Sequence, residues 1–285
     1  MIQFRQLAKT FRRVRVLDGI DLDIGPGERV ALIGSNGAGK TTLIRCLLGE
    51  YTHDGTVAIN GLDPRQNRAA VLGQIGFVPQ LPPPLKMPVG QLIDFSASLC
   101  GVGPRRIHDV ARRLGLDIDA ISTRQFVRLS GGMKQKLLIA IALGRDARVL
   151  VMDEPAANLD PEARKIFFDL LAERLADATM IISSHRLDEV SALVNRVIEM
   201  DMGKIALDDK VADDITLTSR LDCRIVLKRF EAAFAKALAG WNFRESDDRL
   251  IWQGEIAGPD RLRFLGVVSR YTALVADLAL AERAN

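Results

Sequence analysis

Nine consecutive residues carry the clearest chemistry in this chain: residues 34–42 read Gly-Ser-Asn-Gly-Ala-Gly-Lys-Thr-Thr. Phosphate oxygens need many close donors, and glycines let backbone N–H groups turn inward with no Cβ in the way. The Lys40 ammonium would bind the β- and γ-phosphates of a nucleoside triphosphate, and the Thr41 hydroxyl would ligate Mg²⁺. We therefore predict a triphosphate-binding loop that consists of Gly34, Ser35, Asn36, Gly37, Ala38, Gly39, Lys40, Thr41 and Thr42.

The residues on either side of this loop must hold it in place. Residues 30–33 are apolar, as in a strand buried on both faces of a parallel sheet, and apolar residues then recur at helical spacing until Gly49. A helix that begins near Lys40 directs its free N–H groups and the positive end of its dipole at the phosphates. This order of strand, loop and helix argues against a chance glycine-rich turn.

A second strand-like run, residues 149–154, ends in two carboxylates, Asp153 and Glu154. Ligands of open α/β sheets bind at the carboxyl ends of the strands, which is where this pair falls. Asp153 would hold the Mg²⁺ shell, and Glu154 would orient and deprotonate the water that attacks the γ-phosphate. Alone, Asp-Glu-Pro is at least as consistent with a turn, but the phosphate loop upstream favours catalysis.

Residues 129–132 read Leu-Ser-Gly-Gly and precede an apolar helical run. Ser130 suits an N-cap, and Gly131 and Gly132 leave amide groups open, so the pattern indicates a second anion site at a helix N-terminus. Without the first site, an ordinary capped helix would be the better interpretation.

With these motifs, residues 1 to about 210 resemble the nucleotide-binding subunit of an ATP-binding cassette (ABC) transporter. The resemblance implies an α/β P-loop NTPase fold with a mixed sheet and a helical subdomain, and it implies ATP and Mg²⁺ as cofactors. It assigns Gln80 to Mg²⁺ and the attacking water, His185 to catalysis at the γ-phosphate, and Phe11 to stacking on adenine. It also places Val16 at the nucleotide and Asp160 in a loop beside it.

One residue departs from the family pattern, because Met133 stands where a glutamine is usual. The anion-binding residues before it remain, so we expect contact with ATP to persist and the polar contact of the glutamine to be lost. The resemblance further implies a homodimer of cassettes that binds a polytopic transmembrane permease, with no direct nucleic-acid contact.

Domain organisation follows from changes in pattern along the chain. We predict an ATPase domain over residues 1–212, with turns at Asp54-Gly55 and Asn60-Gly61 and a helical subdomain over about residues 81–128. In that subdomain the apolar stripe Val89, Leu92, Ile93, Ser96 and Leu99 is consistent with internal packing, with one wall of a groove for the permease, or with both.

The remaining residues, 218–285, are not explained by these motifs and are predicted to form an accessory domain. Strand and helix signals alternate there as β-α-β-β-α-β, the order of a small ferredoxin-like α+β unit. A structural cap or a dimer contact is a simpler role for it than ligand sensing.

Composition narrows the alternatives. The net charge of +3 is too mild to indicate nucleic acid, and the three cysteines contain no close pair. The chain has no long apolar span and no signal-like start, so we expect a cytoplasmic protein held peripherally at the inner face of the membrane. A non-transport ABC ATPase acting on nucleic acid or the ribosome is the alternative function. The resemblance implies an ATP-hydrolysing subunit that powers a transporter, and the short helical subdomain with its small α/β tail looks more like cassettes of exporter-type or maturation-type systems than like sugar importers. The sequence does not specify the cargo or its direction.

Overall fold

The structure, a computed structural model, describes residues 1–145, 147–174, 178–185, 187–210, 220–241, 243–257, 261–269, 271–272 and 274–282. The chain divides into a cassette unit, residues 1–185 and 196–209, and a C-terminal unit, residues 186–195 and 210–285. The predicted domain boundary between residues 212 and 218 lies outside the described residues.

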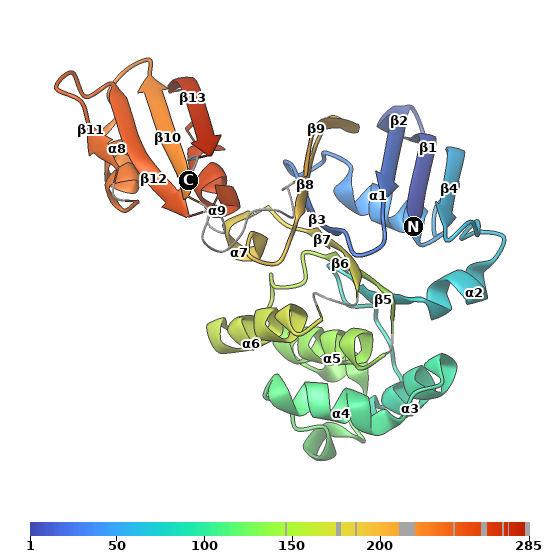
Figure 1. Ribbon diagram of the computed structural model, residues 1–285. Helices are drawn as coiled ribbons and strands as arrows, with labels where there is room; N and C mark the ends of the chain where they lie inside the picture. The colour runs from blue at the N-terminus through green and yellow to red at the C-terminus, as the bar shows by residue number, and fades with distance from the viewer. Residues whose placement is uncertain are drawn as a thin grey trace. The chain divides into compact units, whose positions relative to one another are not determined.

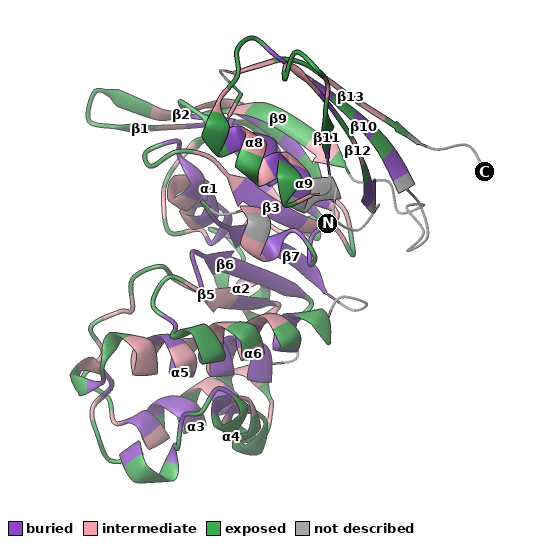
Figure 2. Cartoon of the chain, turned by 90° about the vertical axis from the view of Figure 1, so that its left-hand side faces the viewer, coloured by how far each residue is buried: buried purple, intermediate pink, exposed green. Residues whose placement is uncertain are grey.

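A six-stranded sheet forms the centre of the cassette unit (Figure 1). Its order is β5 (Ile75–Val78), β6 (Val149–Asp153), β7 (Thr179–Ser183), β3 (Arg29–Ile33), β8 (Arg196–Asp201) and β9 (Lys204–Lys210). Neighbours from β5 to β8 run parallel. Because β6 and β7 are buried along their whole length, as in a sheet covered on both faces, their sequences are almost continuously apolar (Figure 2). The strand predicted at residues 149–154 is thus confirmed to Asp153.

A second sheet of the cassette unit is antiparallel, in the order β2 (Val14–Ile24), β1 (Ile2–Phe11) and β4 (Asp54–Ile59). The turn predicted at Asn60-Gly61 is confirmed, since both residues have positive φ and a bridge joins Ile59 to Leu62. The turn predicted at Asp54-Gly55 is wrong, because both residues belong to β4. Gly55 is required there because a Cβ would lie 2.3 Å from the Gln6 carbonyl oxygen.

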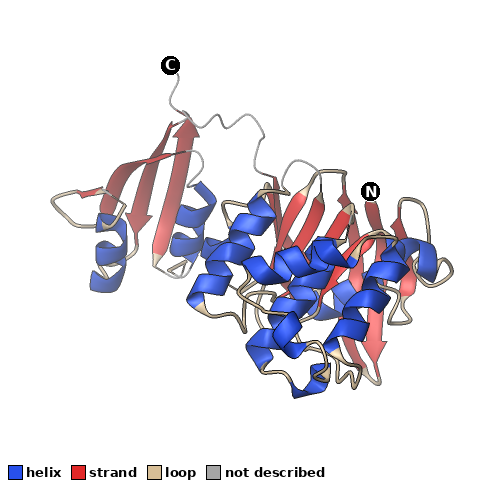
Figure 3. Ribbon diagram, turned by 90° about the horizontal axis from the view of Figure 1, so that it is seen from below, coloured by secondary structure: helices blue, strands red, loops and turns tan. Residues whose placement is uncertain are grey.

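Helix α1 (Lys40–Leu47) packs into one core with residues of both sheets, among them Phe4, Leu32 and Val57. A short helix, α2 (Arg68–Gly73), precedes β5. Helices α3 (Val89–Cys100), α4 (Pro104–Arg113), α5 (Gly131–Gly144) and α6 (Pro161–Ala172) gather on one side of the six-stranded sheet (Figure 3). Two 3₁₀ turns, Asp119–Ile121 and Phe126–Arg128, connect α4 to α5.

The helical core formed by α3, α4 and α5 tests the predicted apolar stripe. Val89 and Ile93 are fully buried, but Leu99 is 69% exposed. Ala97 takes the buried position instead. The buried stripe therefore continues through Ala97, and Leu99 lies outside it.

The C-terminal unit confirms the predicted element order. Its antiparallel sheet has the order β11 (Arg244–Glu245), β12 (Ile251–Ala257), β10 (Arg220–Leu227) and β13 (Val275–Glu282). Helices α8 (Ala232–Ala239) and α9 (Arg261–Ser269) supply Phe234 and Phe264 to a core that also contains Trp252. A short helix, α7 (Leu187–Val190), completes the described elements of this unit.

Candidate functional site

The loop between β3 and α1 has the backbone that its glycines predict. Gly34, Gly37 and Gly39 all have positive φ, at 142°, 87° and 108°. A Cβ on Gly34 would lie 2.2 Å from the Met200 carbonyl oxygen, and one on Gly39 would lie 2.9 Å from Leu17 Cδ2. Glycine is therefore required at both positions by conformation and by space.

Lys40 opens α1 and is almost completely buried. Its Nζ donates to the carbonyl oxygens of Gly34, at 2.7 Å, and Ser35, at 3.2 Å. These bonds hold the ammonium across the loop, so the positive charge is already positioned beside the open N–H groups of the helix N-terminus. This arrangement suits an anion with several oxygens.

A turn far along the sequence supports the same loop. In the β8–β9 turn the Gly203 N–H donates to the Ala38 carbonyl at 3.1 Å, and the Gly203 carbonyl accepts from the Asp18 N–H at 2.9 Å. Gly203 has a φ of 78°, and a Cβ there would lie 2.3 Å from the Val16 carbonyl oxygen. Sequence reasoning missed Gly203, because no local signal shows which segment its turn contacts.

The carboxylates at the end of β6 are buried and individually held. Asp153 Oδ1 accepts from the Ser183 hydroxyl at 2.6 Å, and the Glu154 N–H donates to Ser183 Oγ at 2.9 Å. Ser183 thus fixes both acidic residues from the neighbouring strand. The contacts of Ser183 depend on the β6–β7 pairing, which places it opposite Asp153.

Glu154 is 9% exposed and has a φ of 49°, a conformation that costs a non-glycine residue about 1–3 kcal/mol. His185 Nδ1 donates to Glu154 Oε1 at 2.7 Å, since an ionised carboxylate can only accept. The structure therefore brings together Glu154 and His185, two residues that the sequence paired only through the resemblance. The strained backbone aims the carboxylate at its histidine partner.

One cavity of about 350 Å³ collects most of the predicted residues. Its lining is Val16, Asn36, Gly37, Ala38, Gly39, Lys40, Thr41, Thr42, Gln80, Asp153 and Glu154. Gly34 and Ser35 contact Lys40 from the base of the loop. The cavity thus brings together residues that the sequence predicts for phosphate binding, Mg²⁺ binding and water activation.

Phe11 does not belong to the cavity lining that the structure describes. It ends β1, is 38% exposed, and packs edge-on against Tyr51 with ring centroids 5.1 Å apart. The Lys9 ammonium lies 4.8 Å from the centre of its ring. The assignment of Phe11 to adenine stacking stays a prediction.

The second anion site has the predicted cap. Ser130 is the N-cap of α5, and its hydroxyl accepts from the Met133 N–H at 3.2 Å. Ser130 and Gly131 are exposed, and Gly132 is partly exposed. All three lie outside the lining of the Lys40 cavity. The Met133 side chain packs against the helical core instead of making a polar contact.

Helix α5 is nevertheless tied to the loop that follows Glu154. Buried Gln135 donates through Nε2 to the Pro155 carbonyl at 2.9 Å, and Lys136 pairs with Asp160 at 2.9 Å. Asp160 is also the N-cap of α6, where its carboxyl accepts a hydrogen bond from the Ala163 N–H. This bond is the main cause that lowers the pKa of the Asp160 carboxyl, and the hydrogen bond with Lys136 lowers the pKa further. A displacement of the Ser130 end of α5 would thus reach the residues beside the base.

The cavity also suits Mg²⁺, although no group of three metal-ligating His, Cys, Asp or Glu side chains is found among the described residues. Mg²⁺ at a nucleotide keeps several waters and is bound through one or two carboxylates beside the phosphates. Asp153 lines the cavity and would be such a carboxylate, and the side-chain oxygens of Thr41 and Gln80, which also line it, would complete the predicted ligand set.

Comparison with known proteins places this site in a family. A family model described as ABC transporter matches residues 17–157. The Nod factor export ATP-binding protein I of Paraburkholderia xenovorans (strain LB400) is 32% identical over 236 residues, which are 79% of this chain and 75% of that protein. The phosphonates import ATP-binding protein PhnC of Cupriavidus pinatubonensis (strain JMP 134 / LMG 1197) is 33% identical, over 71% of this chain and 80% of that protein.

Among solved structures, an ATP-binding subunit of an ABC transporter matches with a TM-score of 0.68 and 25% identity. The match covers 75% of this chain and 91% of that one. The relatives found by sequence and the match found by structure are therefore all ATP-binding proteins or subunits.

Proposed function

This chain belongs to the ATP-binding cassette family of transporter ATPases, and from that premise we propose that two copies pair around two ATP molecules to power an exporter-type or maturation-type transporter. The observation that carries the proposal is the separation of two anion sites within one chain. The Lys40 cavity holds the charge and the base, while the exposed Ser130 end of α5 lies outside its lining.

Phosphate binding is the first step in this account. The loop amides and the Lys40 ammonium would replace water around the β- and γ-phosphates. Thr41 and Asp153, with Gln80, would hold Mg²⁺, which neutralises charge on the phosphate oxygens. Ser183 keeps one oxygen of Asp153 occupied at 2.6 Å, which fixes the orientation of the other.

Water activation is the second step. Glu154 accepts the proton of the attacking water, and the His185 hydrogen bond to Oε1 keeps the carboxylate in place. Because the backbone of Glu154 is held by Ser183, the base has little freedom to rotate away from the phosphate. ATP hydrolysis then depends more on how the phosphate, the Mg²⁺ and the attacking water are positioned than on a protein group that reacts covalently.

Pairing of two copies completes each site. The open amides at Gly131 and Gly132 would bind the γ-phosphate held by Lys40 of the second copy, in an isologous two-site arrangement. The bonds from α5 to Pro155 and Asp160 would then report the presence of the partner to the loop beside Glu154.

The proposal of a membrane partner rests on apolar side chains that are exposed on the cassette unit. Leu81, which follows Gln80 in the sequence, is 74% exposed. Phe95 and Leu99 of α3 are 57% and 69% exposed. Every helix that the structure describes is too short or too polar to cross a bilayer. We place the chain at the cytoplasmic face of the membrane, with this patch against a polytopic permease.

Export is the proposed direction because the likeness to the Nod factor export protein spans 79% of this chain, against 71% for the phosphonates import protein. Co-purification from native membranes tests the whole proposal. The tagged chain should retain a polytopic membrane protein, and Phe95→Asp with Leu99→Asp should release it. Leu207→Asp, at an exposed apolar residue of β9, is the matched control and should retain it. Retention by all variants, or no membrane partner at all, would contradict the proposal.

A further inference from the structure

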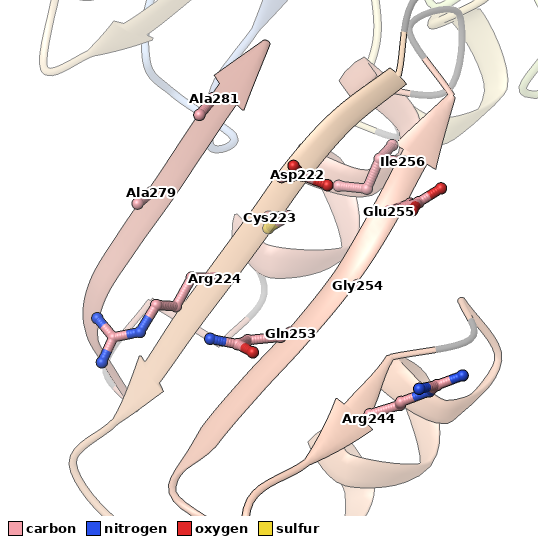
Figure 4. Close-up of a pocket in the computed structure, with 10 residues that line it drawn as sticks. All are labelled: Asp222, Cys223, Arg224, Arg244, Gln253, Gly254, Glu255, Ile256, Ala279 and Ala281. Carbon is pink, nitrogen blue, oxygen red and sulfur yellow. The ribbon is translucent and has the colours of Figure 1, made fainter. Parts of the chain in front are cut away.

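The sheet of the C-terminal unit is covered by helices on one face only. Cys223, Ile225 and Trp252 point to the core beneath α8 and α9. The other face carries exposed Asp222, Arg224, Gln253, Glu255, Ala279 and Ala281 (Figure 4). With Arg244, these residues line an open hollow of about 870 Å³.

Strand register arranges the charges of this face in two neighbouring rows. In one row Asp222 lies between Ala281 of β13 and Glu255 of β12. In the next, Arg224 lies between Ala279 and Gln253, and Arg244 of β11 lies beyond Gln253. The rows are two residues apart, about 7 Å along the strands. One row is therefore acidic and the other basic.

The composition of the hollow narrows the kind of partner. Two arginines balance two carboxylates, so the lining has no net charge to attract a polyanion such as nucleic acid. The lining contains no aromatic residue on which a base could stack, since Phe234, Trp252 and Phe264 belong to the opposite core. A partner that fits this face would present matching acidic and basic rows.

We propose that the partner is the same face of a second copy of this chain. A two-fold axis parallel to the rows and midway between them places each acidic row over the basic row of the other copy. Asp222 then meets Arg224 of the second copy twice, once in each direction, which is the self-complementarity that an isologous interface needs. The small residues Ala279 and Ala281 also meet, so the sheets approach closely.

The distances are suited to this packing. Facing sheets lie about 10 Å apart, a gap that one arginine and one aspartate side chain together bridge. Two open sheets that pack face to face fill the space between them with the side chains of their two inner faces. The aliphatic parts of the arginines contribute apolar contact, and the ion pairs set the register.

Charge reversal tests this geometry by sedimentation equilibrium of the full chain without nucleotide. All chains also carry Lys40→Ala, so that pairing through ATP cannot contribute. This parent chain should form dimers. Either Asp222→Arg or Arg224→Asp alone should weaken the dimer by about 10-fold or more, because both cross-interface pairs become repulsive.

Mixing the two single variants in equal amounts should restore dimers, since each repulsive residue then faces its opposite charge. The matched control is Lys236→Glu, a reversal on the exposed side of α8, which should leave the dimer unchanged. A monomeric parent chain, unchanged affinity in both reversals, or no recovery on mixing would overturn the proposal. Because no nucleotide is present, none of these results depends on the ATPase account.

Discussion

The two units bury different kinds of side chain. In the cassette unit the buried set includes Lys40, Asp153, Glu154 and Ser183, which surround the carboxyl ends of the central strands. In the described part of residues 220–282 every buried side chain is apolar. Burying a polar group costs free energy unless it is paired. In the cassette unit this cost is offset by pairing, both at the predicted site and away from it, where buried Arg196 pairs with Glu28 and Asp208. The C-terminal unit keeps its charges on an open face.

The units also differ in how glycine is used. Gly34, Gly39 and Gly203 are required where three segments meet around a phosphate loop, whereas Gly254 in β12 makes room for the Phe243 ring. The first set serves binding and the second serves packing. Changes in the cassette unit should therefore affect nucleotide chemistry, and changes in the C-terminal unit should affect stability or association.

The largest expected effect is at Glu154. Glu154→Gln keeps the size of the side chain and removes the base, so ATP hydrolysis should slow by roughly 100-fold or more while ATP binding persists. Steady-state phosphate release and equilibrium binding would be measured together. Glu173→Gln, at an exposed surface ion pair with Arg113, is the matched control and should hydrolyse ATP normally. Wild-type turnover in Glu154→Gln would remove it as the base.

Gly203 provides the next test. Gly203→Ala forces a Cβ against the Val16 carbonyl and strains a positive φ, so the turn must move away from Ala38. We expect about a 10-fold loss of ATP affinity, with a smaller change in kcat. Gly27→Ala is the control, because Gly27 has a φ of 74° with open space around its Cβ position. Equal affinities in both variants would show that the turn does not support the loop.

Phe11 should matter less. If its ring stacks on adenine, Phe11→Ala should cost about 1 kcal/mol of binding, or about a 5-fold loss of ATP affinity. Affinity for free triphosphate, which has no base, should not change. If ATP affinity is also unchanged, adenine binds elsewhere and Phe11 serves only its contact with Tyr51.

The last prediction concerns stability at high pH, with no expected effect on nucleotide chemistry, and compares one thiol from each unit. Burial raises the pKa of Cys46 to about 11 and that of Cys223 to about 12. A raised folded-state pKa stabilises the protein below the unfolded value of 9.0, and this stability is lost as pH rises through the window from 9 towards 11 or 12. The slope is at most about 1.4 kcal/mol per pH unit for each thiol.

Unfolding by urea at pH 8 and pH 10 would measure this loss. Cys46→Ala should remove the pH dependence contributed by the cassette unit, and Cys223→Ala that of the C-terminal unit. A wild-type slope in both variants would contradict the burial argument.

The features that the sequence predicted correctly are those encoded by residues close together along the chain. The phosphate loop, the Ser130 cap and the order of the C-terminal elements are encoded within short segments, and the structure contains each of them. The contacts of Gly203 and Ser183 were not predictable, because they join segments that only the sheet order brings together. Helical spacing predicted the stripe on α3 but not which of its residues are covered, because that depends on the helices packed against it: Val89 and Ile93 are buried, whereas Leu99 is exposed.

The central claim, that one ATP site is built from two chains, is tested most directly by mixing two inactive variants. Lys40→Ala removes the phosphate charge, and Ser130→Arg blocks the open helix N-terminus, so each variant alone should hydrolyse little ATP. A mixed pair contains one complete site, formed by Lys40 of one chain and Ser130 of the other. The account predicts that mixing recovers ATPase activity. Failure to recover, in variants shown to fold and pair, or full activity in a proven monomer, would contradict it.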